Sequence, residues 1–450
     1  MLDIYLDKLY RYPRIQECVS VAVPFKKGEL KSISEIAVLQ NGKECIIQPE
    51  VTSSYDDGSV KFLFISFMAD LPANKRTKVI LSVSSEEYDK AVEASKLSYD
   101  NPIEKDENVH KAEVCVKKTE AGYTVNSGEL EFDVSDNSES IFTRLVDGRK
   151  IYTEENFEGP VLKDREGNDY KMSIGEWRVV KPGPVEVTLS AKAYNVVEAD
   201  KDGNTASIDK EDKKGIKNKN IESEIRITAY AGKPWVNISY RIINTSDEEL
   251  NIKSLVFYIK KSKDSRITDK LVHIDMASGN DSTGCGDILT DNSNNNGPIF
   301  MTRGIGELDM IEHRAPVSDI RTMVATSNYK TSFIIGKNGE EVNETIDDSY
   351  LIKEANEHYA EVLYGTFMAD YTDADDGFCV TVHQAQQNYP KAIKSCAEGV
   401  AVMLVPEGVG EITMQSGMAK EQNFLIHWHS PETHIWEIDN RSLIYQMPDR

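Results

Sequence analysis

Apolar and polar residues alternate with a period of two along most of the chain. The repeating segments are short, rich in Val, Ile, Tyr and Phe, and bounded by Gly, Asn, Asp or Pro, which is typical of β-strands. The clearest segments are 17–24, 60–67, 78–84, 129–134, 185–196, 221–230, 235–243, 251–259, 330–336, 400–406 and 423–429. Turn dipeptides separate them, at Asn41-Gly42, Asp57-Gly58, Asp147-Gly148, Asp202-Gly203 and Asn338-Gly339. The pattern predicts many short strands joined by tight turns.

Helical periodicity is rare in this sequence. Residues 86–97 form the best candidate helix, and residues 352–359 form a weaker one. Many short strands with regular turns favour a barrel or a sandwich over an α/β fold. We therefore predict an all-β protein, with a small N-terminal β-barrel followed by a large antiparallel β-sandwich.

A chain of 450 residues exceeds what one hydrophobic core usually organises, so more than one domain is expected. The interval 89–112 is charged and poor in large apolar residues, as linkers tend to be. The predicted organisation is a barrel over 1–88, a linker over 89–112, a sandwich over 113–437 and a C-terminal tail over 438–450. Polar stretches at 201–219 and 281–297 predict long loops.

The formal net charge is −23, from 75 acidic and 52 basic side chains. Such a surface repels phosphate backbones and anionic lipids, so neither nucleic acid nor a membrane is expected as a partner. A polyanionic substrate would need a local basic patch. No run approaches the roughly 18 apolar residues of a membrane span, and the N-terminus lacks a basic start followed by an apolar stretch. These features indicate a cytoplasmic protein, with a leader removed from a longer precursor as the open alternative.

The six cysteines are scattered and form no CxxC motif, which indicates buried free thiols in a reducing compartment. They are Cys18, Cys45, Cys115, Cys285, Cys379 and Cys396. The sequence contains no nucleophile elbow, phosphate loop or dinucleotide-binding glycine turn.

Two stretches resemble a known enzyme family. The segment 55–63, YDDGSVKFL, resembles a hairpin in the N-terminal barrel of the exo-rhamnogalacturonan lyases, polysaccharide lyase family 26, with Tyr55 and Phe62 where the family has Trp. The segment 384–391, QAQQNYPK, followed by GMAK at 417–420, resembles the central sandwich of the same family. Glu421-Gln422 stands where that family has Thr-His, so this part of the match is degraded.

The resemblance implies a carbon–oxygen lyase that cleaves rhamnogalacturonan, a pectin component, by β-elimination at galacturonate. The expected ligand is thus an acidic oligosaccharide. Family members continue into an (α/α) toroid that this sequence lacks, so a separate helical subunit or a homo-oligomer is a possible partner. One alternative is a non-catalytic carbohydrate-binding or assembly module. A second alternative is a glycoside hydrolase, which would need two carboxyl groups at a defined separation.

β-Elimination needs donors or a cation at the uronate carboxylate, a base for the C5 proton and an acid for the leaving oxygen. The candidates for catalysis are His383, His313 and Arg314, and the candidates for substrate binding are Gln384, Gln387 and Tyr389. The competing interpretation for 383–390 is a capped strand end followed by a structural turn. For 312–314 it is a surface charge pair.

No cofactor is expected, but three segments leave metal binding open. His427 and His429 lie two residues apart in a predicted strand and therefore face the same side, where His434 or Glu437 could supply a third ligand. A polar edge strand explains the same pattern. The acidic segments 198–209 and 373–377 have the outline of a calcium loop, although solvated hairpins are the simpler interpretation.

Overall fold

The structure is a computed structural model. It describes most of residues 1–262 and 368–446, together with strands β19 to β24 between residues 271 and 345. The gaps in the two main ranges are 7–12, 73–75, 97–111, 149, 198–216, 373–376, 385–387, 389–390, 397–398, 406–411 and 434. Within these ranges the chain is almost entirely β-structure, as predicted.

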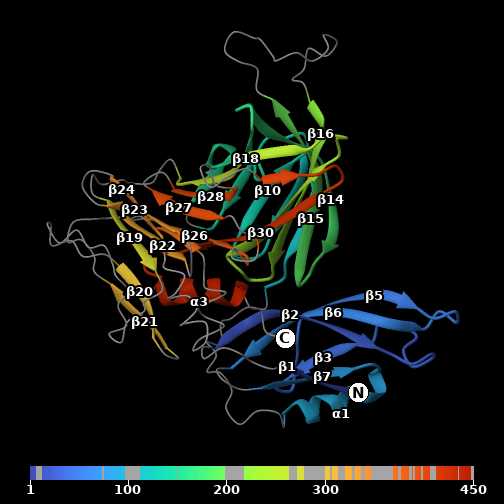
Figure 1. Cartoon of the computed structure of the whole chain (residues 1–450). Helices are drawn as coiled ribbons and strands as arrows, with labels where there is room; N and C mark the ends of the chain where they lie inside the picture. The colour runs from blue at the N-terminus through green and yellow to red at the C-terminus, as the bar shows by residue number, and fades with distance from the viewer. Residues whose placement is uncertain are drawn as a thin grey trace.

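The N-terminal domain consists of two small antiparallel sheets (blue in Figure 1). Its strands are β1 (Leu2–Leu6), β2 (Arg14–Pro24), β3 (Ala37–Gln40), β4 (Lys43–Glu44), β5 (Ile47–Ser54), β6 (Val60–Leu71) and β7 (Thr77–Ser82). One sheet has the order β1-β7-β3-β4 and the other β2-β6-β5. Apolar side chains from both sheets, such as Val38, Leu63 and Phe67, form one buried cluster between them. Asn41 and Gly42 join β3 to β4 with φ of 52° and 74°, as a tight hairpin turn requires.

The second domain is a two-sheet sandwich. A five-stranded sheet contains β8 (Cys115–Lys118), β9 (Gly122–Asn126), β10 (Glu131–Ser135), β11 (Arg144–Val146) and β12 (Ile151–Thr153), and the short 3-10 helix η1 (Glu154–Asn156) follows it. A much larger sheet has the order β19-β22-β25-β26-β30-β17-β16-β15-β14-β13-β18-β28-β27, with β29 paired to β18. Every pairing in it is antiparallel except that of β19 with β22. The prediction of a barrel followed by a large antiparallel sandwich is confirmed.

Among the remaining strands, β15, β16, β17, β18, β23, β28 and β30 lie on predicted segments, and the others were not predicted. The large sheet contains β13 (Phe157–Asp164), β14 (Asp169–Pro182), β15 (Glu186–Val197), β16 (Lys217–Tyr230), β17 (Trp235–Asn244), β18 (Leu250–Lys260), β19 (Leu271–Ala277), β22 (Ile320–Thr326), β25 (Met368–Thr372), β26 (Gly377–Val382), β27 (Ala392–Cys396), β28 (Gly399–Val405), β29 (Ile412–Met414) and β30 (Ala419–His429). Two separate hairpins pair β20 (Ile299–Gly304) with β21 (Glu307–Glu312) and β23 (Lys330–Ile335) with β24 (Glu340–Thr345).

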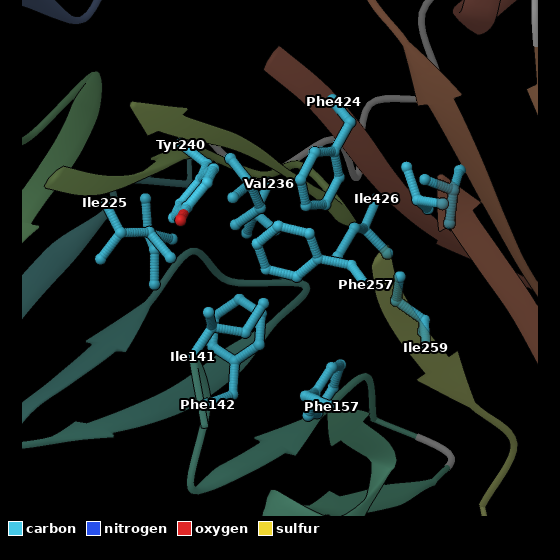
Figure 2. Close-up of a cluster of buried hydrophobic side chains, with 14 of the residues drawn as sticks. Ile141, Phe142, Phe157, Ile225, Val236, Tyr240, Phe257, Ile259, Phe424 and Ile426 are labelled. Atoms are coloured by element: carbon cyan, nitrogen blue, oxygen red, sulfur yellow. The ribbon is translucent and has the colours of Figure 1, made fainter. Parts of the chain in front are cut away.

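Alternation along the strands builds the sandwich core. In β17 the residues Val236, Ile238, Tyr240 and Ile242 are buried, while the intervening residues face outward. Figure 2 shows Val236 and Tyr240 packed with side chains from β18 and β30 against Phe142, which belongs to the connection between β10 and β11. Such interdigitation of side chains from both layers is what fixes the sheets face to face.

Two helices alter the predicted domain limits. Helix α1 (Ser85–Lys96) matches the predicted helix, and its Ala91 is buried against Leu39 and Ile80 of the barrel. The barrel domain therefore reaches Lys96 and includes the first part of the expected linker. Helix α3 (Ile435–Gln446) occupies most of the expected tail, and its Ile438 is fully buried, so this segment belongs to the folded domain. Neither described helix is long and apolar enough to cross a bilayer.

The described cysteines, Cys18, Cys45, Cys115 and Cys379, are free thiols, but the expected burial holds only for Cys379, since Cys18 and Cys45 are half-buried. Cys379 is buried, whereas Cys115 is exposed because it lies on β8, the edge strand of the five-stranded sheet.

Polar contacts dock the barrel on the sandwich. Ser66 of β6 donates a hydrogen bond of 3.0 Å to Glu186 of β15, and Glu186 also pairs with Lys181. The amide oxygen of Gln48 accepts hydrogen bonds from the backbone N–H groups of Val185 and Glu186, at 3.0 and 2.9 Å. Helix α3 lies between the two domains in Figure 1, beside β2. These hydrogen bonds and the ion pair position the two domains relative to each other, so side chains from both can form one site.

Candidate functional site

A cavity of about 320 Å³ lies where the barrel, the sandwich and helix α3 meet. Its wall comes from β2, from the end of β16 and the start of β17, from the residue after β26, from β30 and from α3. Pockets of this size are at the small end of those that hold organic ligands. A larger, open groove of about 1000 Å³ lies beside η1 and β13, where Glu158 pairs with Lys260.

The β16–β17 turn presents Lys233 and Trp235 to the cavity. Gly232 in this turn has φ of 64° and its N–H donates to the carbonyl of Ser127 at 2.6 Å. A Cβ at this position would lie 3.1 Å from the Cβ of Ala112, so both the backbone conformation and the space favour glycine.

Glu17 enters the cavity from a β-bulge. The pairing of β2 with β6 shifts register between Arg14 and Glu17, and the intervening Gln16 has φ of 48°. Asp70 holds this conformation, because its Oδ1 accepts hydrogen bonds from the backbone N and the side-chain Nε2 of Gln16, at 2.9 and 3.0 Å. Bulges of this kind redirect a side chain.

Glu17 meets Arg441 of α3 in a two-pronged ion pair. Arg441 donates from Nη1 and Nη2 to the two carboxylate oxygens, at 2.8 and 2.7 Å. Burial alone would raise the pKa of Glu17, but the adjacent guanidinium outweighs it and lowers that pKa to about 2. The carboxylate is therefore ionised at neutral pH, and it neutralises Arg441.

The ring of Trp235 lies beside the two cations of the cavity. The guanidinium of Arg441 lies 4.0 Å from the ring centroid, and the Lys233 ammonium lies 5.1 Å from it. The Lys233 ammonium also donates to the backbone carbonyl of Ile15 at 2.9 Å. Burial lowers the pKa of Lys233 to about 8, although Glu17 acts in the opposite direction. Lys233 is therefore largely charged at neutral pH in a poorly hydrated place.

His383 faces the same cavity from the end of β26. Its backbone N–H donates to the carbonyl of Asn423 at 2.9 Å, and its ring lies edge-on to Tyr445, with 5.3 Å between centroids. Burial lowers the pKa of His383, so its imidazole is neutral at neutral pH.

Tyrosine hydroxyls complete the polar wall. Tyr445 donates to the side-chain oxygen of Asn237 at 2.5 Å. Burial raises the pKa values of Tyr445 and Tyr230, so both keep their protons at neutral pH. The cavity thus offers a cation, a neutral imidazole and phenolic hydroxyls around an indole face.

Of the residues predicted from sequence, His383 lies in this cavity. Gln384 follows it with φ of 46°, and its backbone N–H donates to Gln446 of α3 at 2.7 Å, which anchors the turn. The other candidates, His313, Arg314, Gln387 and Tyr389, lie outside the described residues.

Sequence reasoning missed Glu17, Lys233, Trp235, Arg441 and Tyr445. The only local signal was Gly232 through Trp235, a glycine-containing turn that leads a tryptophan into a strand. Glu17 and Arg441 are 424 residues apart in the chain, so no motif could associate them.

His427 and His429 do share one face of β30, with 5.7 Å between ring centroids. His429 already uses both ring nitrogens: Nε2 is 2.8 Å from Asp370, and Nδ1 is 3.0 Å from the carbonyl of Ser430. His427 packs edge-on against Trp235, and burial lowers its pKa well below the ordinary value.

No three His, Cys, Asp or Glu side chains gather as a metal site in the part of the chain that the structure describes. The proposed third ligand His434 is outside that part, as are the acidic segment 198–209 and most of the segment 373–377. The described residues therefore supply no set of ligands for the metal sites considered from the sequence.

Comparison with known proteins identifies the N-terminal domain. Residues 4–81 match the family described as PcRGLX-like N-terminal RIFT barrel domain. This match confirms the resemblance of the barrel to that of the rhamnogalacturonan lyase family. No curated protein matches the chain.

Solved structures give distant likenesses. An alpha-mannosidase from Enterococcus faecalis V583 is 10% identical with a TM-score of 0.46, over 100% of this chain and 45% of that one. A Glycosyl Hydrolase Family 38 protein from Enterococcus faecalis is 10% identical with a TM-score of 0.47, over 100% of this chain and 46% of that one. A galactose mutarotase-like protein from Lactobacillus casei ATCC 334 is 11% identical with a TM-score of 0.30, over 70% and 100%. The chain thus spans about half the length of the first two.

Proposed function

We propose that this chain is a carbohydrate-active protein of the lyase type, and that the junction cavity binds a uronate-containing oligosaccharide. The observation that carries the proposal is the grouping of Lys233, Trp235 and neutral His383 around one cavity. The Lys233 ammonium can pair with a substrate carboxylate, and Trp235 positions that ammonium, which lies 5.1 Å from the centroid of its ring. The barrel's match to a lyase-like family supports the same chemistry.

The proposed reaction is β-elimination. Lys233 neutralises the uronate carboxylate, which makes the C5 proton more acidic. The neutral ring of His383 removes that proton, the electron pair forms the C4–C5 double bond, and the C4–O bond breaks. A protonated tyrosine, Tyr445 or Tyr230, gives its proton to the leaving oxygen. The products are an unsaturated uronate and a shortened sugar.

The test is direct. The purified chain is mixed with rhamnogalacturonan oligosaccharides, and the ultraviolet absorbance of an unsaturated uronate product is followed. We expect the absorbance to rise with the wild-type chain and to stay flat with His383→Ala. The control is Lys192→Met, an exposed change on β15 away from the cavity, which should leave the rate unchanged.

A second candidate function is a non-catalytic carbohydrate-binding or assembly module. It is favoured by the Glu17–Arg441 pair, because the protein itself occupies both nitrogens that an Arg would offer to a substrate carboxylate. The same assay separates the two functions. A flat trace with measurable sugar binding supports the module, whereas a flat trace without binding contradicts both.

A further inference from the structure

Glu17 is held as a ligand carboxylate would be held. The two-pronged geometry between Glu17 and Arg441 is the one by which arginine recognises carboxylates. The two side chains come from different domains and are only 13% and 14% exposed, and both line the cavity. The barrel thus inserts a carboxylate into a site that the sandwich and α3 otherwise form.

The local backbone maintains this insertion. Gln16 adopts a left-handed conformation, which non-glycine residues rarely do, and Asp70 holds it with two hydrogen bonds. Unusual backbone at a cavity wall is a common feature of ligand sites.

The charges of the cavity follow from this arrangement. Arg441 is neutralised by Glu17, so Lys233 supplies the net positive charge among the described residues that line the cavity. An ammonium has three N–H donors, and Ile15 takes one of them. One carboxylate can therefore pair with Lys233, while a second carboxylate near Arg441 would meet Glu17 and be repelled.

We propose that Glu17 is a specificity-determining residue, which makes the cavity accept a sugar whose single carboxylate is flanked by neutral units and discriminate against consecutive uronates. This inference rests on the proposed function, because it concerns the same cavity. It assigns to the barrel domain a direct part in choosing the ligand.

Two probes of equal length test the inference by calorimetry on the full chain. One alternates galacturonate with rhamnose, and the other contains galacturonate alone. We expect the wild-type chain to prefer the alternating probe. Glu17→Gln should raise the affinity for the all-galacturonate probe at least tenfold and change the other affinity less. Glu50→Gln, an exposed change on β5 of the same domain, is the matched control and should leave the ratio unchanged.

The outcomes separate this inference from the proposed function. Suppose that Glu17→Gln lowers the melting temperature and leaves the ratio of the two probe affinities unchanged. The Glu17–Arg441 pair then only stabilises the domain junction, and the inference is overturned. If the wild-type chain binds neither probe, the proposed function fails. If Glu17→Gln then binds the all-galacturonate probe, the exclusion of consecutive uronates by Glu17 is still supported. If it binds neither probe, the inference is overturned as well. Should Glu17→Gln not fold, Glu17→Asp keeps the charge with a shorter reach and should give an intermediate ratio.

Discussion

Two groups of ionisable side chains lie close together in this molecule and differ in how they are enclosed. The side chains of Asp370 and His429 are 0% and 2% exposed, and both oxygens of the carboxylate accept hydrogen bonds, from His429 and from Thr372. The second group, Glu17 with Arg441 and Lys233, opens into a cavity. His427, next to His429, packs edge-on against Trp235, next to Arg441, with 5.4 Å between the ring centroids, so the two groups are in contact through these rings.

The comparison separates a structural pair from a binding site. A buried charge that is satisfied on all sides can stabilise only the fold, whereas a desolvated charge that faces a cavity can also meet a ligand. We therefore expect changes in the first group to alter stability and changes in the second to alter sugar binding. The predictions below test that division.

The largest effect is expected from Asp370→Ala. Removal of the carboxylate leaves the ring of His429 buried without the hydrogen-bond partner of its Nε2, and a buried polar group left unsatisfied costs about 1–3 kcal/mol. Urea denaturation should show this loss of unfolding free energy. Sugar affinity, measured where the variant is folded, should stay within about twofold. A large loss of binding with unchanged stability would contradict the division.

Lys233→Met should have the opposite profile. It removes the ammonium that faces the cavity, so affinity for an acidic oligosaccharide should fall at least tenfold, or about 1.4 kcal/mol. Its unfolding free energy should not fall, because burial disfavours the charged ammonium in the folded chain and this offsets the lost hydrogen bond to the Ile15 carbonyl. Calorimetry with Lys192→Met as control measures the first quantity, and thermal melting measures the second. Equal losses in both lysine variants would argue against a role for the cavity.

The pH dependence of binding sharpens the assignment to Lys233. Its pKa is lowered from 10.5 to about 8, while Glu17, whose pKa is lowered to about 2, stays ionised across that range. Affinity for a carboxylate should therefore fall as pH rises through about 8. Stability should rise between pH 8 and 10.5, because the unfolded chain then binds more protons than the folded one. An affinity that is constant from pH 6 to 10 would exclude Lys233 as the carboxylate ligand.

The smallest effect is expected from Tyr445→Phe. The change removes the hydrogen bond to Asn237 and keeps the ring that packs against His383. The expected loss is about 1 kcal/mol of unfolding free energy, with a few-fold loss of sugar affinity. Urea denaturation and calorimetry measure the two quantities. An effect larger than that of Lys233→Met would place the main polar contact at the tyrosine.

Strands could be predicted because the alternation of apolar and polar residues that defines a strand is visible among neighbouring residues. Trp428 faces the core while its neighbours His427 and His429 face the other side, as the period of two requires. Helix α3 was missed because its apolar and polar residues separate less clearly into two faces than those of α1. The site was mostly invisible, because β2, the β16–β17 turn, β26 and α3 come together only through long-range pairing and domain docking. His383 was found only through a stretch that resembles a known family.

The central claim is that the junction cavity binds a sugar through its carboxylate. Its most direct test is calorimetry of the wild-type chain with a rhamnogalacturonan oligosaccharide and with the same oligosaccharide after reduction of its carboxyl groups to alcohols. The account predicts measurable binding of the acidic form and at least tenfold weaker binding of the reduced form, with the difference lost in Lys233→Met. Equal affinity for both forms, or the same difference in the wild-type chain and in Lys233→Met, would contradict it.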